Sequence, residues 1–374
     1  MKTIPFLRPR LTGARFEGKA IPLEFLKDLS ALEEMIVEMA KFFFIKDHPD
    51  RKRLPRGFTE GIELRLSGLD EGSTIPIISL VVTSATLFPP EGQAYLERAR
   101  DEVIRAISTT ERHQGITGLP GKALGYFNRI GRSLRDGEAM EFPTPDGQGV
   151  ARLTKETRRR LLLTSTDIRE LTEEVTIRGT VPEVDQADMT FEIGLPDGRK
   201  VKAPLEPQYL DTILDAFNGY RTAARILLRG VGRFNRAERL LGLDSVEHVS
   251  LLDPLDVPAR LEEIALLKDG WLDGKGQSPP KEGLHWLGQA FTSYYPDDLP
   301  LPYIYPTPEG GLQLEWTLGV HEVSLEINLF SHSAYWHGLS LDTGEEISQS
   351  LHLEEPSGWS WIVTEVQRLL GGVA

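Results

Sequence analysis

The order of short segments between residues 170 and 255 constrains the fold more than any other feature of the chain. Three alternating segments predict strands, an amphipathic segment predicts a helix, and two further alternating segments follow. Three strands, a helix and two strands are the element order of an OB-like small barrel, and Gly179 and Gly230 fall where such barrels bend strongly. An SH3-like barrel or a plain five-stranded sheet fits nearly as well. The segments are EEVTIRGTVPEVD, MTFEIGL, RKVKAPL, EPQYLDTILDAF, ARILLRGVGRF and SVEHVSLL.

Composition changes near residue 255. From Asp256 to Ala374 there are 18 Asp and Glu but only five Lys and Arg, a net charge of −13 out of −14 for the whole chain, whereas residues 1–169 carry about +4. All six tryptophans also lie beyond residue 255, at positions 271, 286, 316, 336, 359 and 361. The segment LLDPLDVP supplies the prolines of a boundary, and 374 residues exceed what one core usually serves. We therefore predict three domains: residues 1–169, 170–255 and 256–374.

The first region has the pattern of an α+β domain. Apolar residues recur every three or four positions over 21–46, which predicts an amphipathic helix, and a hairpin is predicted over 61–82. Helices over about 91–109 and 121–134, the strand GVARLT and the short helix KETRRRLLL follow. The arginine triplet at 158–160 in that helix could meet phosphate or an acidic partner, including the chain's own C-terminal domain. A solvated surface is the more frequent explanation for such a triplet.

The last region is predicted to be an antiparallel sheet with helices packed on one face. A helix ends at Gly270, and the next begins with Ser278 as N-cap and Pro279 in its first turn, so Trp271 and Trp286 serve as packing anchors of the pair. The proline-rich stretch over 294–311 should run extended over the surface. GLQLEWTLG, HEVSLEINLF, SAYWHGLSL and EEISQSLHL then predict a four-stranded meander, closed by the helix GWSWIVTEVQRLLGG.

Several stretches of this region resemble a C-terminal module of bacterial proteins to which no activity is assigned. They are GWLDGKG with SPP, LPLPYIYPTPEGG and SLEI, and the preceding TRRRLLL resembles the segment that usually accompanies the module. The resemblance covers roughly residues 120–374. It implies a cytoplasmic accessory protein of the kind found near toxin-antitoxin and phage-defence genes, and it supplies no catalytic residue.

Few residues in the sequence suggest catalysis. The chain has no cysteine, which excludes disulfides and thiolate zinc sites, and it has neither a GxSxG elbow nor a phosphate-binding loop. His332 and His337, with nearby glutamates, are weak candidates for a metal site, but an offset of five puts them on opposite faces of a regular strand. We therefore predict no catalytic residue and no cofactor, and the sequence favours a protein that is not an enzyme. Without a secretory h-region or a long apolar run, we expect a cytoplasmic protein with no membrane partner.

Two binding functions remain, together with one catalytic alternative. The leading hypothesis is a non-enzymatic regulatory protein, antitoxin-like or defence-accessory, whose acidic, tryptophan-rich domain holds a basic protein partner. Its candidate residues are Trp271, Asp273, Glu315, Trp316 and Trp336. The alternative is single-stranded nucleic-acid binding by the central barrel, with candidates Arg199, Lys200, Arg229, Arg233 and Arg236. A metal-dependent hydrolase using the C-terminal His and Glu residues is a second alternative.

Overall fold

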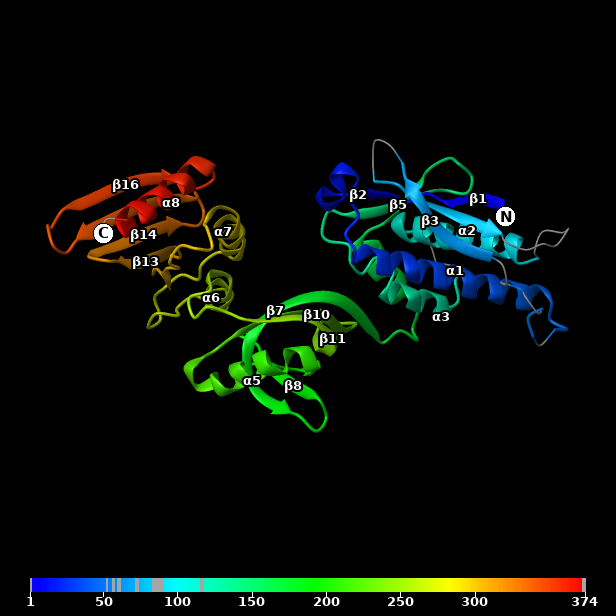
Figure 1. Ribbon diagram of the computed structural model, residues 1–374, viewed down its shortest axis with the longest axis horizontal. Coiled ribbons are helices and arrows are strands. Elements are labelled where there is room, and N and C mark those ends of the chain that lie inside the picture. The colour runs from blue at the N-terminus through cyan, green and yellow to red at the C-terminus, as the bar shows by residue number, and fades with distance from the viewer. Residues whose placement is uncertain are drawn as a thin grey trace. The chain divides into compact units, whose positions relative to one another are not determined.

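The computed structural model describes residues 2–51, 53–55, 58, 62–70, 74–82, 91–114 and 118–371 (Figure 1). It is an α+β protein, as predicted, and its helices accompany antiparallel sheets. The chain divides into two compact units. Unit 1 comprises residues 1–175 and 231–244, and unit 2 comprises residues 176–230 and 245–374. The three-domain division stays a prediction.

Unit 1 contains two three-stranded sheets. The first has the order β1-β4-β3, in which the predicted hairpin of β3 (Ile62–Leu69) and β4 (Pro76–Val82) is extended by β1 (Lys2–Leu7). The second has the order β2-β5-β6 and consists of β2 (Arg10–Thr12), β5 (Ala139–Pro143) and β6 (Val150–Leu153). Only β6 of this second sheet was predicted, because β2 has only three residues and β5 begins with two adjacent buried residues, Ala139 and Met140, which interrupt the alternation.

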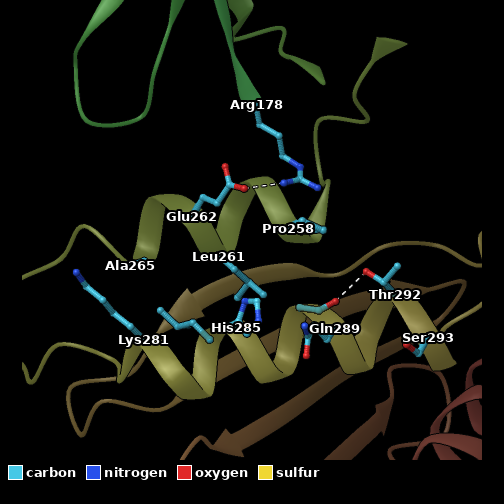
Figure 2. Close-up of a pocket in the computed structure, with 12 residues that line it drawn as sticks. Arg178, Pro258, Leu261, Glu262, Ala265, Lys281, His285, Gln289, Thr292 and Ser293 are labelled. Atoms are coloured by element: carbon cyan, nitrogen blue, oxygen red, sulfur yellow. Dashed lines mark hydrogen bonds and ion pairs between the residues drawn. The ribbon is translucent and has the colours of Figure 1, made fainter. Parts of the chain in front are cut away.

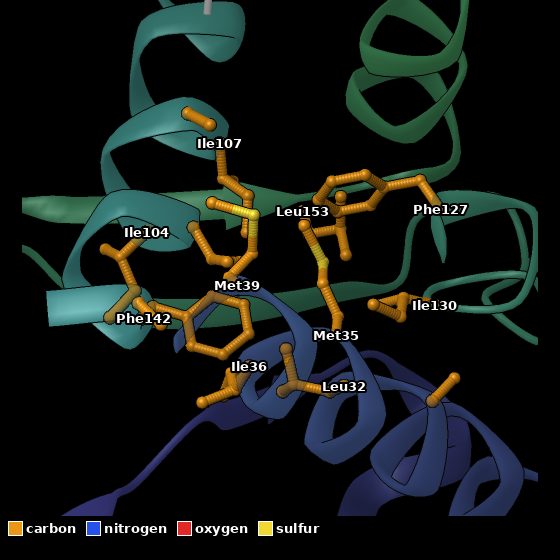
Figure 3. Packing of buried hydrophobic residues seen from close by; sticks show 14 of the residues in the cluster. Leu32, Met35, Ile36, Met39, Ile104, Ile107, Phe127, Ile130, Phe142 and Leu153 are labelled. Atoms are coloured by element: carbon orange, nitrogen blue, oxygen red, sulfur yellow. The ribbon is translucent and has the colours of Figure 1, made fainter. Parts of the chain in front are cut away.

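Helices α1 (Phe25–Asp47) and α2 (Glu91–Glu111) pack together and carry the core of unit 1. Met35 and Met39 of α1, Ile107 of α2 and Phe142 of β5 are buried members of this one core cluster (Figure 3). Both helices match the predicted ones closely. The helix predicted over 121–134 is instead two short pieces, α3 (Gly121–Leu124) and the 3-10 turn η2 (Gly125–Asn128). Its last apolar residues, Ile130 and Leu134, are still buried.

The arginine triplet lies on α4 (Lys155–Thr164), and its first member is not solvated. Arg158 is 1% exposed, and its guanidinium donates to the backbone oxygens of Phe127 (2.6 Å), Asn128 (3.3 Å) and Thr172. Burial lowers the pKa of this guanidinium to about 10, which leaves it charged at neutral pH. The explanation of the triplet as a solvated surface is therefore wrong for Arg158, because η2 and the first residues of β7 (Glu170–Asp185) need its donors.

Asp28, on α1, is another buried charge of unit 1, in addition to Arg158 and Glu138. It is 3% exposed, and the backbone N–H of Ser133 donates to its Oδ2 at 3.4 Å. Burial raises the pKa of Asp28 from 3.8 to about 6. A carboxyl group whose pKa is higher in the folded than in the unfolded state stabilises the fold when protonated, and this stabilisation is lost as the pH rises through about 6.

We expect Asp28→Asn to be more stable than the wild type at pH 7.5 by up to about 3 kcal/mol, since each pKa unit corresponds to about 1.4 kcal/mol. The difference should shrink between pH 6 and 4, where Asp28 becomes neutral in the wild type as well. Urea unfolding followed by circular dichroism at several pH values measures it. Asp136→Asn, at a carboxylate that is 92% exposed, is the matched control and should change little. A pH-independent difference between Asp28→Asn and the wild type would contradict the assignment.

The predicted strands over 170–255 form one curled sheet with the order β11-β10-β7-β8-β9. Its remaining strands are β8 (Thr190–Gly194), β9 (Lys200–Pro204), β10 (Ile226–Asn235) and β11 (Leu240–Leu251), and helix α5 (Leu210–Asn218) follows β9. Both glycines predicted to lie at bends are sites of close backbone approach. A Cβ at Gly179 would lie 2.4 Å from the oxygen of Gly194, and one at Gly230 would lie 2.2 Å from that of Ser245.

The C-terminal part of unit 2 is a five-stranded antiparallel sheet in the order β12-β13-β14-β15-β16. The predicted meander comprises β13 (Leu312–Leu318), β14 (His321–Asn328), β15 (Ser333–Ser340) and β16 (Glu346–His352). Helices α7 (Lys281–Tyr294) and α8 (Pro356–Gly371) share a core with one face of this sheet, and α6 (Val257–Ile264) precedes them (Figure 1).

Three predictions about this part need correction. The helix predicted to end at Gly270 ends at Ile264. The proline-rich stretch is not entirely extended surface, because Tyr303–Pro306 forms β12 and pairs with β13. Helix α7 begins at Lys281 and has Pro280, not Ser278, as its N-cap. A residue before proline disfavours helical backbone, so Pro279 cannot take a helical conformation before Pro280. Ser278 instead donates through its hydroxyl and its backbone N–H to Asp269.

Candidate partner-binding surface

Two of the predicted partner anchors are core residues. Trp336 is 0% exposed and Trp316 is 4% exposed, and their rings lie 5.9 Å apart among the residues that the sheet shares with its helices. The Trp316 indole donates to the backbone oxygen of Pro300 at 3.0 Å. Neither can contact a partner, so their prediction as anchors is wrong. Alternation explains the error: both tryptophans occupy the strand positions that face the helices.

Trp271 and Asp273 belong to the loop between α6 and α7. The half-buried Trp271 donates its indole N–H to the backbone oxygen of Gln277 at 3.0 Å, and its ring covers Gly276, where a Cβ would lie 2.6 Å from Nε1. Asp273 is exposed and has a left-handed backbone with φ 48°. The structure therefore uses Trp271 to close its own loop, which leaves Asp273 as the solvent-facing member of the pair.

Glu315 lies on the face of the C-terminal sheet opposite the helices, which we call the open face. Strand register sets its residues in rows across the sheet. Its aromatic members, Tyr303, Tyr305 and Tyr335, are 54%, 46% and 48% exposed. The rows are Tyr303, Glu315, Ser324, His337 and Ser348; Tyr305, Gln313, Glu326, Tyr335 and Ser350; and Thr317, Glu322, Leu339 and Glu346.

The open face carries acids that the neighbouring sequence does not neutralise. Glu315, Glu322, Glu326 and Glu346 lie on it, and the chain has no Lys or Arg between Lys281 and Arg368. The recorded contacts of these acids are local: Glu315 accepts from the amide of Gln313 at 2.6 Å, and Glu346 lies 3.7 Å from the Nε2 of His337. This combination of exposed tyrosines and acids suits a basic partner.

The predicted nucleic-acid candidates have a different environment, because most of them already have acceptors. Arg199 pairs with Asp197 at 2.6 Å, Lys200 with Glu192 at 3.0 Å, and Arg233 with Asp244 at 3.0 Å. Arg236 donates to the backbone oxygens of Leu163, Ser165 and Ile168, while Arg229 is exposed.

These cations are also divided between the two units. Arg199, Lys200 and Arg229 belong to unit 2, and Arg233 and Arg236 belong to unit 1. Cations that already pair with acids of their own chain attract phosphate less strongly.

The two histidines considered for a metal site have other roles. His332 stacks on Trp286 with ring centroids 3.7 Å apart, and its Nδ1 lies 2.9 Å from Oε1 of Glu354. His337 lies on the open face beside Glu346. Within the described ranges, no three His, Asp or Glu side chains are placed so that they could hold a metal ion. The hydrolase alternative therefore has no ligand cluster among these residues.

Unit 2 also has a groove of about 690 Å³ between α6 and α7 (Figure 2). Leu261, Leu284 and Gly288 are among its apolar lining, and Lys281 and His285 line it from α7. On its other side, Arg178 of β7 bonds Glu262 of α6 at 2.6 Å, and burial raises the pKa of that glutamate. This ion pair fastens α6 to the curled sheet. Among the described lining residues, no nucleophile is hydrogen-bonded to a base.

Comparisons of the chain with protein-family models, curated proteins and solved structures find no match. No described helix combines the length and the apolar character that crossing a membrane requires.

Proposed function

We propose that this chain is a non-enzymatic protein-binding or regulatory protein whose open face holds a basic segment of a protein partner. The observation that carries the proposal is the set of cross-strand rows that place three exposed tyrosines on the same face as four glutamates, with no Lys or Arg in the neighbouring sequence. Tyrosine offers a large contact area at low entropy cost, and glutamates select cationic side chains. Tyr303, Tyr305 and Tyr335 take the role that the sequence analysis gave to buried tryptophans.

The resemblance to modules near toxin-antitoxin and phage-defence genes supports a more specific form of this proposal. An antitoxin-like or defence-accessory protein binds another protein in the cytoplasm, and nucleic-acid-directed toxins commonly present basic surfaces. An acidic face without local cations would complement such a surface. This form of the proposal rests on sequence resemblance alone, and the binding experiment below does not depend on it.

We also propose that residues 170–255 are an OB-like barrel opened along one side. The helix α5 between the third and fourth strands and the strong curl of the sheet support this over a plain sheet. Nucleic-acid binding there remains the second candidate function. Arg229, exposed on β10, favours it, but the local ion pairs of Arg199, Lys200 and Arg233 weigh against it.

We expect the full chain to bind a fluorescent oligolysine peptide in a salt-sensitive way, and Glu315→Lys with Glu326→Lys to weaken that binding by about tenfold or more. Each reversed surface charge costs about 1 kcal/mol, and 1.4 kcal/mol is a factor of ten. Fluorescence anisotropy at low ionic strength measures the affinity, with labelled single-stranded DNA as the comparison ligand.

Glu282→Lys with Glu355→Lys is the matched control. It makes the same change in net charge on α7 and just before α8, away from the strands of the open face. An equal loss in both double variants would show that binding follows net charge and not the open face. Tighter binding of DNA than of the peptide by the wild type would favour the second candidate function.

A further inference from the structure

Strand β16 is an unprotected edge of the C-terminal sheet. It is last in the strand order, pairs with β15 over seven residues without a register shift, and is exposed from Glu346 to Ser350. The opposite edge, β12, is only four residues long and ends in Pro306. Proteins usually shield a long edge with lysine, proline or a bulge, because its free backbone groups pair with other strands. The strand EISQSLH has none of these devices.

Two hydrogen bonds beside the ladder show which backbone groups of β16 are free. The N–H of Ser340 donates to the oxygen of Glu345, and the N–H of Leu353 donates to the oxygen of His332. Glu345 and Leu353 flank β16, and both of these odd-numbered residues bond toward the β15 side. Because bonded residues alternate along an antiparallel strand, the even-numbered residues direct their N–H and C=O outward. Ser348 and Ser350 therefore present free donors and acceptors at the edge.

We propose that β16 pairs antiparallel with β16 of a second copy of this chain, on a twofold axis through Gln349. The sequence EISQSLH is nearly self-complementary about that residue. Ser348 then lies opposite Ser350 of the second copy, and the two residues exchange both backbone hydrogen bonds. The twofold axis generates the equivalent pair, in which Ser350 lies opposite Ser348 of the second copy. The inference is independent of the proposed partner, which occupies the open face.

The side chains of the two copies also match on both faces of this pair. On the open face, Glu346 lies opposite His352 of the second copy, where the imidazole N–H can donate a hydrogen bond to the carboxylate. On the helix face, Ile347, which is 41% exposed, lies opposite Leu351 of the second copy. A parallel arrangement would instead set Glu346 beside Glu346, placing two carboxylates together.

The dimer should be weak. A pair of seven-residue strands buries less than the roughly 1,200 Å² of a stable interface, which points to a dissociation constant in the micromolar range. The outer ends also contribute less than the centre, because Gly358 approaches the oxygen of His352 so closely that a Cβ there would lie 2.4 Å from it. Ser348 and Ser350 therefore carry most of the pairing.

The absence of cysteine from the chain makes a direct test possible. At the twofold axis, Gln349 faces its own copy in a non-hydrogen-bonded pair, with Cα atoms about 4.5 Å apart. That separation lies within the roughly 4.4–6.8 Å that a disulfide spans. We expect Gln349→Cys to form a disulfide-linked dimer under mild oxidation, much faster than Gln367→Cys on the exposed face of α8. Equal rates for the two variants would overturn the proposal.

Ser350→Pro provides the second test. Its N–H points outward, so proline removes a dimer bond and leaves the pairing with β15 intact. Sedimentation equilibrium should show concentration-dependent dimerisation of the wild type and a monomeric Ser350→Pro whose circular dichroism is unchanged. A wild type that stays monomeric at high concentration, or a Ser350→Pro that still dimerises, would contradict the pairing. If the wild type stays monomeric, β16 does not pair with a second copy, and the edge is open to a strand of another protein.

Discussion

Arg158→Met should lower the free energy of unfolding of unit 1 by about 3–5 kcal/mol. Three backbone oxygens accept hydrogen bonds from this guanidinium, and that of Asn128 also accepts from the Thr172 hydroxyl at 2.7 Å. The substitution therefore removes the donor of the Phe127 and Thr172 oxygens, and each buried acceptor left without a partner costs about 1–3 kcal/mol. Methionine fills much of the same volume, so the loss reports the missing donors and not a cavity. Urea unfolding followed by far-ultraviolet circular dichroism measures the change.

The adjacent Arg160→Met is the matched control. Arg160 lies on the same helix, pairs with Glu156 and is 33% exposed, so its loss should cost less than about 1 kcal/mol. All six tryptophans lie in unit 2, so their fluorescence gives a separate record of that unit. If both variants lose equal stability, Arg158 does not hold η2 and β7 as described.

Trp336→Ala should cost about 3–5 kcal/mol in unit 2, the usual range for deleting a fully buried aromatic side chain. Trp336 has no exposed surface, and its ring lies 5.9 Å from that of Trp316 and 5.5 Å from that of Trp361. Within the part of the chain that the structure describes, its buried indole N–H has no hydrogen-bond partner. Trp336→Phe should therefore cost clearly less than Trp336→Ala, because phenylalanine removes the unpaired donor and keeps most of the apolar contact.

Trp271→Ala is the comparison, and about 1 kcal/mol is expected because the loop loses one hydrogen bond to Gln277. Thermal unfolding followed by circular dichroism ranks the three variants. If Trp336→Ala weakened peptide binding and left stability unchanged, the side chain would be a partner anchor after all, and the placement of the tryptophan in the core would be wrong.

The strands and long helices could be predicted because their periodicity is strong. In Leu312–Leu318 every second residue is apolar, so the strand and its buried face follow from the sequence. The same pattern places Trp316 with the leucines, but composition alone suggested a tryptophan-rich surface. The exposed positions of the pattern, occupied by Glu315 and by the tyrosines of β12, carry the candidate surface. The alternation of apolar and polar residues along the strands therefore located that surface better than the tryptophan content did.

Features that depend on distant partners could not be predicted. Arg158 resembles its two neighbours in sequence, and only the arrival of η2 and β7 decides that it is buried. The short strand β12 has two tyrosines and a proline, and it forms because its backbone pairs with the adjacent strand β13. The sequence suggested that Arg199 and Arg233 were free to bind nucleic acid. In the fold, the turns and the strand register place Asp197 and Asp244 beside them.

The chain passes between the two units within β7, β10 and β11, and not through linkers between domains. Each unit is therefore discontinuous in sequence: unit 1 needs residues 231–244, and unit 2 begins within β7. Fragments that end at residue 169 or begin at residue 256 would each lack strands of their own unit and expose new sheet edges to aggregation. Residues 231–244 would have to be rejoined to residues 1–175 by a designed connection before unit 1 could be studied alone.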